Sequence, residues 1–140
     1  MIIVRAGDVK GWVSPPPHQR TLKVLLSPSL QDVAQGLAMG MVMLPPGLTS
    51  PPHSHDREQE VWYVVSGTGR IRIGQEEAEL WPDTIVVSPP GVEHQLTNDG
   101  PEELKAIWLF TPAGPEVSYL PPEQESSRGP GPQGPAPVGC

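Results

Sequence analysis

Turn-forming residues divide this chain into short segments, and their spacing limits the available folds more than any other feature. Proline, glycine, asparagine and aspartate cluster at residues 45–47, 82–83, 89–91 and 98–101. The runs between these clusters are rich in apolar and β-branched residues and lack a helical period. Short extended segments separated by turns about every 8–12 residues predict an all-β sandwich or barrel.

Period-2 alternation and β-branched runs locate the expected strands. Met39, Met41 and Met43 occupy every second position, which predicts a half-buried strand, whereas the apolar run at 84–88 predicts a buried one. The extended segments we expect are 1–4, 11–13, 18–26, 34–44, 60–65, 69–74, 79–81, 84–88, 93–97 and 104–110.

The composition changes near residue 112. The chain has 140 residues with 20 prolines and 15 glycines, and many of these lie in the last thirty positions. Such a segment buries too little apolar surface to offset the entropy of ordering it. We therefore predict one domain over residues 1–112 and a disordered Pro/Gly-rich tail over residues 113–140.

Charge and hydropathy exclude several classes of partner. Nine basic against sixteen acidic residues give a net charge of −7, which argues against nucleic-acid binding. No run of 18 apolar residues exists to span a membrane, and the N-terminus lacks a signal-peptide pattern. The one cysteine, Cys140, has no internal partner. We expect a cytoplasmic protein that acts on a small molecule.

Two histidines and a glutamate lie close together in residues 47–67. His53 and His55 are two apart, so on an extended segment both imidazoles point to one face. Glu60 opens the next expected strand, and we expect a hairpin to bring it beside the histidines. Imidazole and carboxylate converging inside a barrel are typical metal ligands. A third histidine, His94, follows the turn at 89–91.

The spacing of these residues resembles the two motifs of the cupins. Gly47, His53, His55, Glu60 and Gly67 fit G-x5-H-x-H-x4-E-x6-G, and Pro89, Gly91, His94 and Asn98 fit G-x5-P-x-G-x2-H-x3-N. The first position of the second motif is Asp83 in place of glycine, and aspartate is also acceptable in a turn. The resemblance covers residues 47–98.

This resemblance implies a cupin jelly-roll barrel, also called a double-stranded β-helix, with one divalent metal bound by His53, His55, Glu60 and His94. Three neutral imidazoles and one carboxylate leave a net charge of +1, which a semi-apolar cavity tolerates. A six-coordinate ion keeps two open positions, and iron, manganese, nickel or cobalt fits better than zinc. A closed structural zinc site and a site that has lost its metal are the alternatives.

Other residues are candidates for the pocket wall. By strand parity Trp62 faces inward with Glu60, and either Trp108 or Ile107 faces inward on the last strand. Met41 is our third candidate for substrate binding, although core packing is commoner for such methionines. Weaker candidates are His18, Arg20 and Arg57 near the substrate, Asn98, Ser54 and Thr97 as supports of the ligands, and Tyr63 as an outward packing residue.

The resemblance favours a metal-dependent enzyme of dioxygenase type acting on a chelated, oxygenated organic substrate. An alternative is a redox-inert metal enzyme that stabilises an enolate for isomerisation, cyclisation, lyase or decarboxylation chemistry. A non-catalytic metal- or ligand-binding module is the third option. We also expect a homodimer, with the Trp12 region adding a strand to the partner's sheet.

Overall fold

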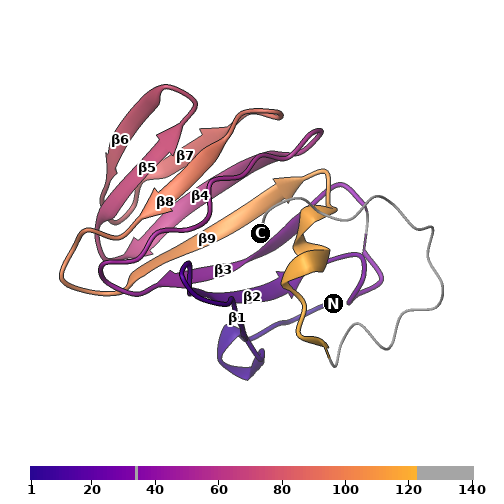
Figure 1. Ribbon diagram of the computed structural model, residues 1–140. Helices are drawn as coiled ribbons and strands as arrows, with labels where there is room; N and C mark the ends of the chain where they lie inside the picture. Colours follow the sequence, from indigo (N-terminus) through magenta and orange to yellow (C-terminus); the bar gives the residue numbers. More distant parts are fainter. Residues whose placement is uncertain (34, 123–140) are drawn as a thin grey trace.

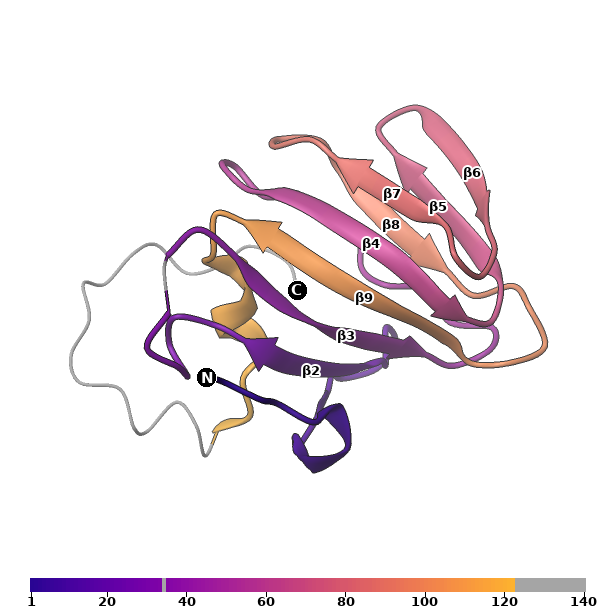
Figure 2. The same cartoon turned by 180° about the vertical axis from the view of Figure 1, so that it is seen from behind.

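The computed structural model describes residues 1–33 and 35–122, and these residues form an antiparallel all-β fold. Figure 1 and Figure 2 show these strands from opposite sides. The elements are η1 (Ala6–Asp8), β1 (Trp12–Val13), β2 (Thr21–Leu26), β3 (Ala38–Leu44), β4 (Gln59–Ser66), β5 (Gly69–Ile73), β6 (Glu76–Leu80), β7 (Ile85–Ser88), β8 (His94–Thr97), β9 (Leu104–Thr111) and η2 (Pro115–Tyr119).

The strand order is that of a jelly roll. One sheet has six strands in the order β1-β2-β3-β9-β4-β7, and the other has three in the order β6-β5-β8. Some neighbours in the large sheet are distant in sequence, since β9 lies between β3 and β4. The predicted fold class, an all-β double-stranded β-helix, is confirmed.

Alternating burial along β9 places the core between the sheets. Leu104, Ala106, Trp108 and Phe110 are buried, while the residues between them are partly exposed. Burying each large aromatic side chain contributes about 1.5–3 kcal/mol. Across the sheet Gly40 of β3 lies opposite Trp108, and a Cβ there would come within 2.2 Å of the indole. The absence of a side chain at Gly40 therefore makes room for Trp108.

The segment before β4 does not form the hairpin that we predicted. Thr49 pairs with Thr97 and His53 pairs with His94 in isolated antiparallel bridges. This segment therefore runs along β8 of the small sheet, whereas β4 pairs with β7 and β9 in the large sheet. Proline at positions 51 and 52 removes the donors that a continuous ladder needs.

The backbone conformation of two turns explains which residue types occupy two positions of the cupin motifs. Asp83 replaces the motif glycine and adopts φ +63°, the left-handed conformation that aspartate tolerates better than most residues. Gly67 has φ +79°, and a Cβ there would lie 2.3 Å from the carbonyl oxygen of Glu103. The departure from the motif at residue 83 thus preserves the backbone geometry of the turn.

Two expected strands differ from the structure. Residues 1–4 form no strand, and their apolar side chains are exposed. The segment 84–88 is not buried: β7 is the edge strand of the large sheet, with Ile85 64% and Val87 50% exposed. An apolar run predicts extended structure but does not show whether both faces are covered.

The packed part of the chain extends past residue 112, where we predicted the tail to begin. Tyr119 and Leu120 are buried in the core, and η2 lies beside the large sheet (Figure 1). Glu116 is also buried; it accepts hydrogen bonds from the Ser27 hydroxyl (2.8 Å) and the Gly114 N–H (2.6 Å). The rest of the predicted tail, residues 123–140, lies outside the described residues.

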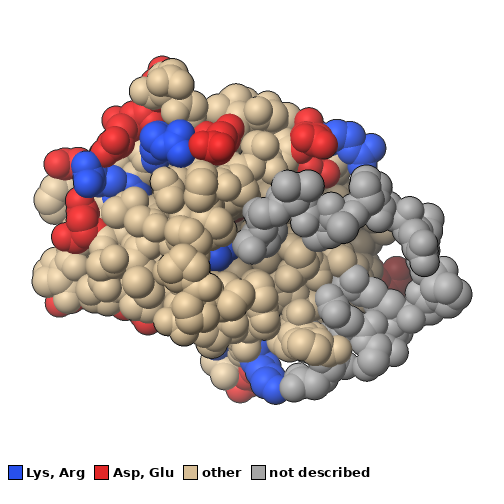
Figure 3. Space-filling model, in the orientation of Figure 1, with Lys and Arg blue, Asp and Glu red and all other residues tan. Residues whose placement is uncertain are grey.

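Exposed ion pairs lie on the small sheet. Arg70 contacts Glu77 (2.6 Å) and Asp99 (2.7 Å), and Arg72 contacts Glu93 (2.8 Å). Figure 3 shows basic and acidic side chains side by side at this end of the molecule. Exposed pairs of this kind contribute about 0–1 kcal/mol each, so the core provides most of the stability.

None of the helical segments in the described ranges has the length and apolar character needed to cross a bilayer.

Candidate metal centre

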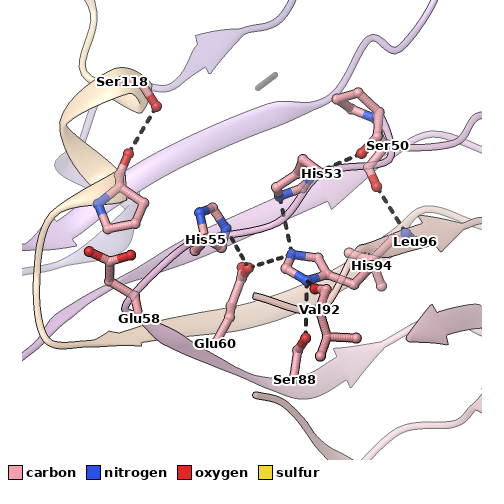
Figure 4. Close-up of polar contacts among 12 residues, drawn as sticks. Ser50, His53, His55, Glu58, Glu60, Ser88, Val92, His94, Leu96 and Ser118 are labelled. Carbon is pink, nitrogen blue, oxygen red and sulfur yellow. Dashed lines mark hydrogen bonds and ion pairs between the residues drawn. The ribbon is translucent and has the colours of Figure 1, made fainter. Parts of the chain in front are cut away.

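Four side chains meet between the two sheets. His53, His55, Glu60 and His94 each direct one ligand atom to a common point, and these atoms lie within 4.8 Å of one another. Oε2 of Glu60 is 2.9 Å from Nε2 of His94 and 3.2 Å from Nε2 of His55. Nε2 of His94 is 3.2 Å from Nε2 of His53. Figure 4 shows the three rings and the carboxylate facing one another.

Both sheets contribute to this cluster. Glu60 comes from β4 of the large sheet and His94 from β8 of the small sheet. Reciprocal main-chain hydrogen bonds between His53 and His94, 3.1 and 2.8 Å long, hold these two residues side by side. The Gly91 N–H donates to the carbonyl of His55 (2.7 Å), which ties that residue to the following turn. The convergence therefore depends on the closure of the barrel.

Carbonyl groups orient two of the rings. Nδ1 of His53 donates to the Pro51 carbonyl (2.7 Å), and Nδ1 of His94 donates to the Val92 carbonyl (3.3 Å). Because a carbonyl oxygen only accepts, each Nδ1 must carry the proton. The Ser88 hydroxyl lies 3.1 Å from Nδ1 of His94 as a further partner. These contacts turn Nε2 of both rings toward the cluster, as in histidines that bind metals.

The donor set fits a divalent cation. In a neutral ring with its proton on Nδ1, Nε2 carries a lone pair, so His53 and His94 present lone pairs to each other across 3.2 Å. The Glu60 carboxylate adds another acceptor at the same point. A cation is the group that satisfies all of these acceptors at once, and three imidazoles with one carboxylate suit a first-row transition metal.

The electrostatics of the site maintain the protonation states that metal binding requires. Burial raises the pKa of the Glu60 carboxyl, but the adjacent rings of His55 and His94 outweigh burial and hold the pKa below its ordinary value. Burial, followed by the neighbouring His94, lowers the pKa of His53 from 6.5 to about 4. At neutral pH Glu60 is therefore ionised and His53 is neutral.

A small cavity adjoins the cluster. Its volume is about 20 Å³, enough for about one water molecule. Trp62 and Trp108 both line it, as we predicted for Trp62 and as one of two options for the last strand. Met41 does not line it: the inner face of β3 carries the neighbouring Val42, which does. Met41 is buried and alternates with Val42 along β3, and its predicted role in substrate binding stays a prediction.

Two further residues line the cavity. Arg20 is only 3% exposed, although solvated arginines are commoner, and it precedes β2 at the cavity wall. Tyr119 belongs to η2, in the segment that we assigned to the tail. The Pro/Gly-rich composition of this segment predicted disorder. Only the isolated apolar pair Tyr119 and Leu120 indicated that the segment packs against the core.

The predicted supports of the ligands are wrong. Asn98 instead organises a turn, donating to the Leu44 and Glu102 carbonyls and accepting from the Gly100 N–H. Ser54 is exposed, and Thr97 lies on β8 away from the rings. The groups that orient the rings are Ser88 and two main-chain carbonyls, which residue type alone does not reveal.

The remaining candidates lie outside the cavity wall. His18 contacts the Thr49 carbonyl through Nδ1 (2.9 Å), and Arg57 is exposed. Tyr63 points outward, as predicted, and donates to the Asp83 carboxylate. None of these three residues is among those that line the cavity.

Comparison with known proteins agrees with this geometry. Residues 40–110 match the family model described as the cupin domain, and this range contains the whole cluster. The chain belongs to the cupin family. The resemblance found in its motifs is thereby confirmed.

Two relatives of this cupin come from Streptomyces. Polyketide synthase CurC of Streptomyces cyaneus is 29% identical over 97 residues, which cover 69% of this chain and 62% of CurC. Tetracenomycin polyketide synthase protein TcmJ of Streptomyces glaucescens is 26% identical over 102 residues, covering 71% of this chain and 68% of TcmJ. The cupin thus matches about two thirds of the length of these relatives.

A solved structure supports the fold. The polyketide cyclase RemF from Streptomyces resistomycificus superimposes with a TM-score of 0.69 over 82% of each chain. Its sequence is 22% identical to this one. At that identity the likeness shows a shared fold.

Proposed function

We propose that this cupin is a metal-dependent enzyme that catalyses a redox-neutral reaction, such as cyclisation or isomerisation, of an oxygenated organic substrate. The observation that carries the proposal is the buried cluster of three histidines and one glutamate in a chain related to polyketide synthase proteins. RemF, a polyketide cyclase with the same fold, supports the same class of chemistry. These likenesses favour the redox-inert alternative over the dioxygenase that we first expected.

Different residues of the chain would bind the metal ion, orient the rings and exclude water. His53, His55, Glu60 and His94 would hold the ion, and the bound ion would act as a Lewis acid toward a substrate carbonyl oxygen. Ser88 and the carbonyls of Pro51 and Val92 keep the rings in place. Trp62 and Trp108 exclude bulk water, which strengthens electrostatic interactions at the site.

The size of the cavity limits how a substrate binds. A volume of about 20 Å³ admits about one water-sized group, such as a carbonyl oxygen, rather than a whole polycyclic molecule. We propose that the substrate directs its carbonyl oxygens to the cluster and leaves its remaining framework toward the cavity opening.

Proton exchange with a simple diketone tests this proposal. Protein loaded with manganese, cobalt or zinc is mixed with 1-phenyl-1,3-butanedione in deuterated buffer, and deuterium incorporation at the central carbon is followed by NMR. We expect faster exchange than with the free metal ion and no oxygen consumption. A Glu60→Gln variant should lose the acceleration.

The same experiment separates the alternatives. Metal-dependent oxygen uptake by the iron-loaded protein, without faster exchange, would support the dioxygenase. Stoichiometric metal binding with neither activity would support a non-catalytic binding module.

The homodimer stays a prediction. β1, which carries Trp12, is an edge strand of the large sheet and leaves one side available for pairing. Light scattering should give twice the chain mass of 15.1 kDa if the prediction holds.

A further inference from the structure

Arg20 is a buried cation in the wall of the metal cavity. It follows the proline-rich turn at residues 15–17 and directly precedes β2. The residue is 3% exposed and lines the same cavity as Glu60 and His94. Arginine is almost never buried this deeply unless it is paired with an anion.

The guanidinium has few partners within the described residues. Its Nη1 lies 3.4 Å from the Ser14 hydroxyl and 3.5 Å from the His18 carbonyl. Both acceptors are neutral and both distances are long for hydrogen bonds, while a guanidinium offers five donors. No carboxylate of residues 1–33 and 35–122 lies within ion-pair distance of Arg20. Arg70 and Arg72, in contrast, contact acidic side chains at 2.6–2.8 Å.

The indole of Trp108 presents a second unmet donor in the same wall. Its Nε1 is buried and has no hydrogen-bond partner among the described residues. Buried polar groups without partners are rare, because each costs about 1–3 kcal/mol. An indole N–H without a partner and a weakly paired guanidinium, both lining one cavity, indicate donors available to a group outside the described residues.

The charge of the site indicates that a ligand contacting Arg20 is negatively charged. A divalent ion and the Glu60 carboxylate together carry +1, and Arg20 raises the total in the cavity to +2. Positive charge in a water-poor cavity is stable only when anions neutralise it. A neutral carbonyl compound leaves this charge unbalanced, whereas an organic acid balances it.

Resting on the proposed function, we propose that the substrate is a carboxylate-bearing keto compound and that Arg20 binds its carboxylate. The substrate carbonyls face the cluster of His53, His55, Glu60 and His94, and the acid group faces the guanidinium. Arginine suits this role because its planar fork matches a carboxylate bidentately. Arg20 thereby selects acids over neutral ketones of the same shape.

A matched pair of probes tests the assignment without any turnover. Acetylacetone and 2,4-dioxopentanoate share one 1,3-diketone, but only the second carries a carboxylate. Their dissociation constants from the zinc-loaded protein are measured by isothermal titration calorimetry. We expect the wild type to bind 2,4-dioxopentanoate at least about tenfold more tightly, as one added charge-assisted ion pair permits.

Variants then locate the preference. Arg20→Met should abolish the preference while leaving acetylacetone affinity within about twofold, and Arg20→Lys should retain part of it. Arg57→Met removes the same charge from an exposed position and should leave the preference unchanged. Should Arg20→Met fail to fold, Arg20→Lys and the wild-type comparison still decide.

Two results would overturn the assignment. One is equal affinity of the wild type for both probes. The other is an undiminished preference in Arg20→Met. Because both readouts are binding constants, loss of proton exchange with an intact acid preference would refute the proposed function and leave Arg20 as the anion site.

Discussion

The metal cluster and the residues that line the rest of the cavity differ in how well their polar groups are matched. In the cluster the rings of His53 and His94 have oriented Nδ1 partners, and Glu60 contacts two rings. In the rest of the lining Arg20 has two long contacts and Nε1 of Trp108 has no partner within the described residues. The difference indicates that the cluster is complete for an ion, whereas the rest of the lining has donors available to a group outside the described residues.

Removal of a cluster residue should have the largest effect. Glu60→Gln and His94→Ala should each lower metal affinity by more than the roughly 10–100-fold that loss of a supporting hydrogen bond costs. Metal content per chain after dialysis, measured by mass spectrometry, checks this. Glu58→Gln is the matched control, since Glu58 lies outside the cluster. Equal metal content in Glu60→Gln and Glu58→Gln would show that Glu60 does not bind the ion.

Acid should destabilise the metal-free protein, because His53 and Glu60 of the cluster have lowered pKa values. The pKa of His53 is lowered to about 4 by burial, so between about pH 6.5 and pH 4 only the unfolded chain takes up this proton. The free energy of unfolding should therefore fall as the pH decreases through this window, by up to about 3 kcal/mol for a pKa lowered from 6.5 to about 4. The lowered pKa of Glu60 acts in the same direction below its ordinary value.

Urea unfolding of chelator-treated protein at pH 7.5 and pH 5 measures this dependence. A His53→Gln variant should show a weaker pH dependence, and His18→Gln, outside the cluster, should retain that of the wild type. A His53→Gln variant with unchanged pH dependence would contradict the prediction.

Overpacking beside Trp108 should affect stability rather than metal binding. In Gly40→Ala the new Cβ would lie 2.1 Å from the Lys23 carbonyl oxygen and 2.2 Å from Cζ2 of Trp108. Relief of these contacts should lower the free energy of unfolding by about 1–3 kcal/mol, while the folded fraction keeps its metal affinity. Chemical denaturation and metal titration separate the two quantities. Gly36→Ala, whose added Cβ would meet no atom within 4 Å, is the control and should change little.

Loss of the ring support at Ser88 should have the smallest effect of the series. Ser88→Ala removes the hydroxyl 3.1 Å from Nδ1 of His94 but leaves the Val92 carbonyl. Metal affinity should fall about tenfold, the lower end of the range for such partners. Ser50→Ala, which removes a hydroxyl bonded to the Leu96 main chain, should leave the affinity unchanged. Equal losses in both variants would mean that Ser88 acts only through packing.

Much of the cluster side could be predicted from the sequence. The four ligand residues follow from motif spacing, and the inward position of Trp62 follows from its parity with Glu60. Parity left Trp108 and Ile107 undecided, because the answer depends on Gly40 across the sheet. The predicted hairpin between the histidine segment and β4 was wrong, since the histidine segment pairs with β8.

The rest of the cavity lining was harder to predict. Arg20 is buried, but nothing in its sequence neighbourhood distinguishes it from the exposed Arg57. Tyr119 lies in a segment whose composition predicts disorder. Met41 does not line the cavity, and the sequence could not show this because both faces of β3 carry apolar residues. Each of these positions is determined by contacts distant in sequence.

We expect one divalent ion to be bound jointly by His53, His55, Glu60 and His94. X-ray absorption spectroscopy of the cobalt- or zinc-loaded protein measures the ligands of that ion directly. We predict three imidazoles and at least one oxygen at about 2.0–2.2 Å, with one imidazole fewer in His94→Ala. A spectrum with one imidazole or none, or one that His94→Ala leaves unchanged, would contradict the account.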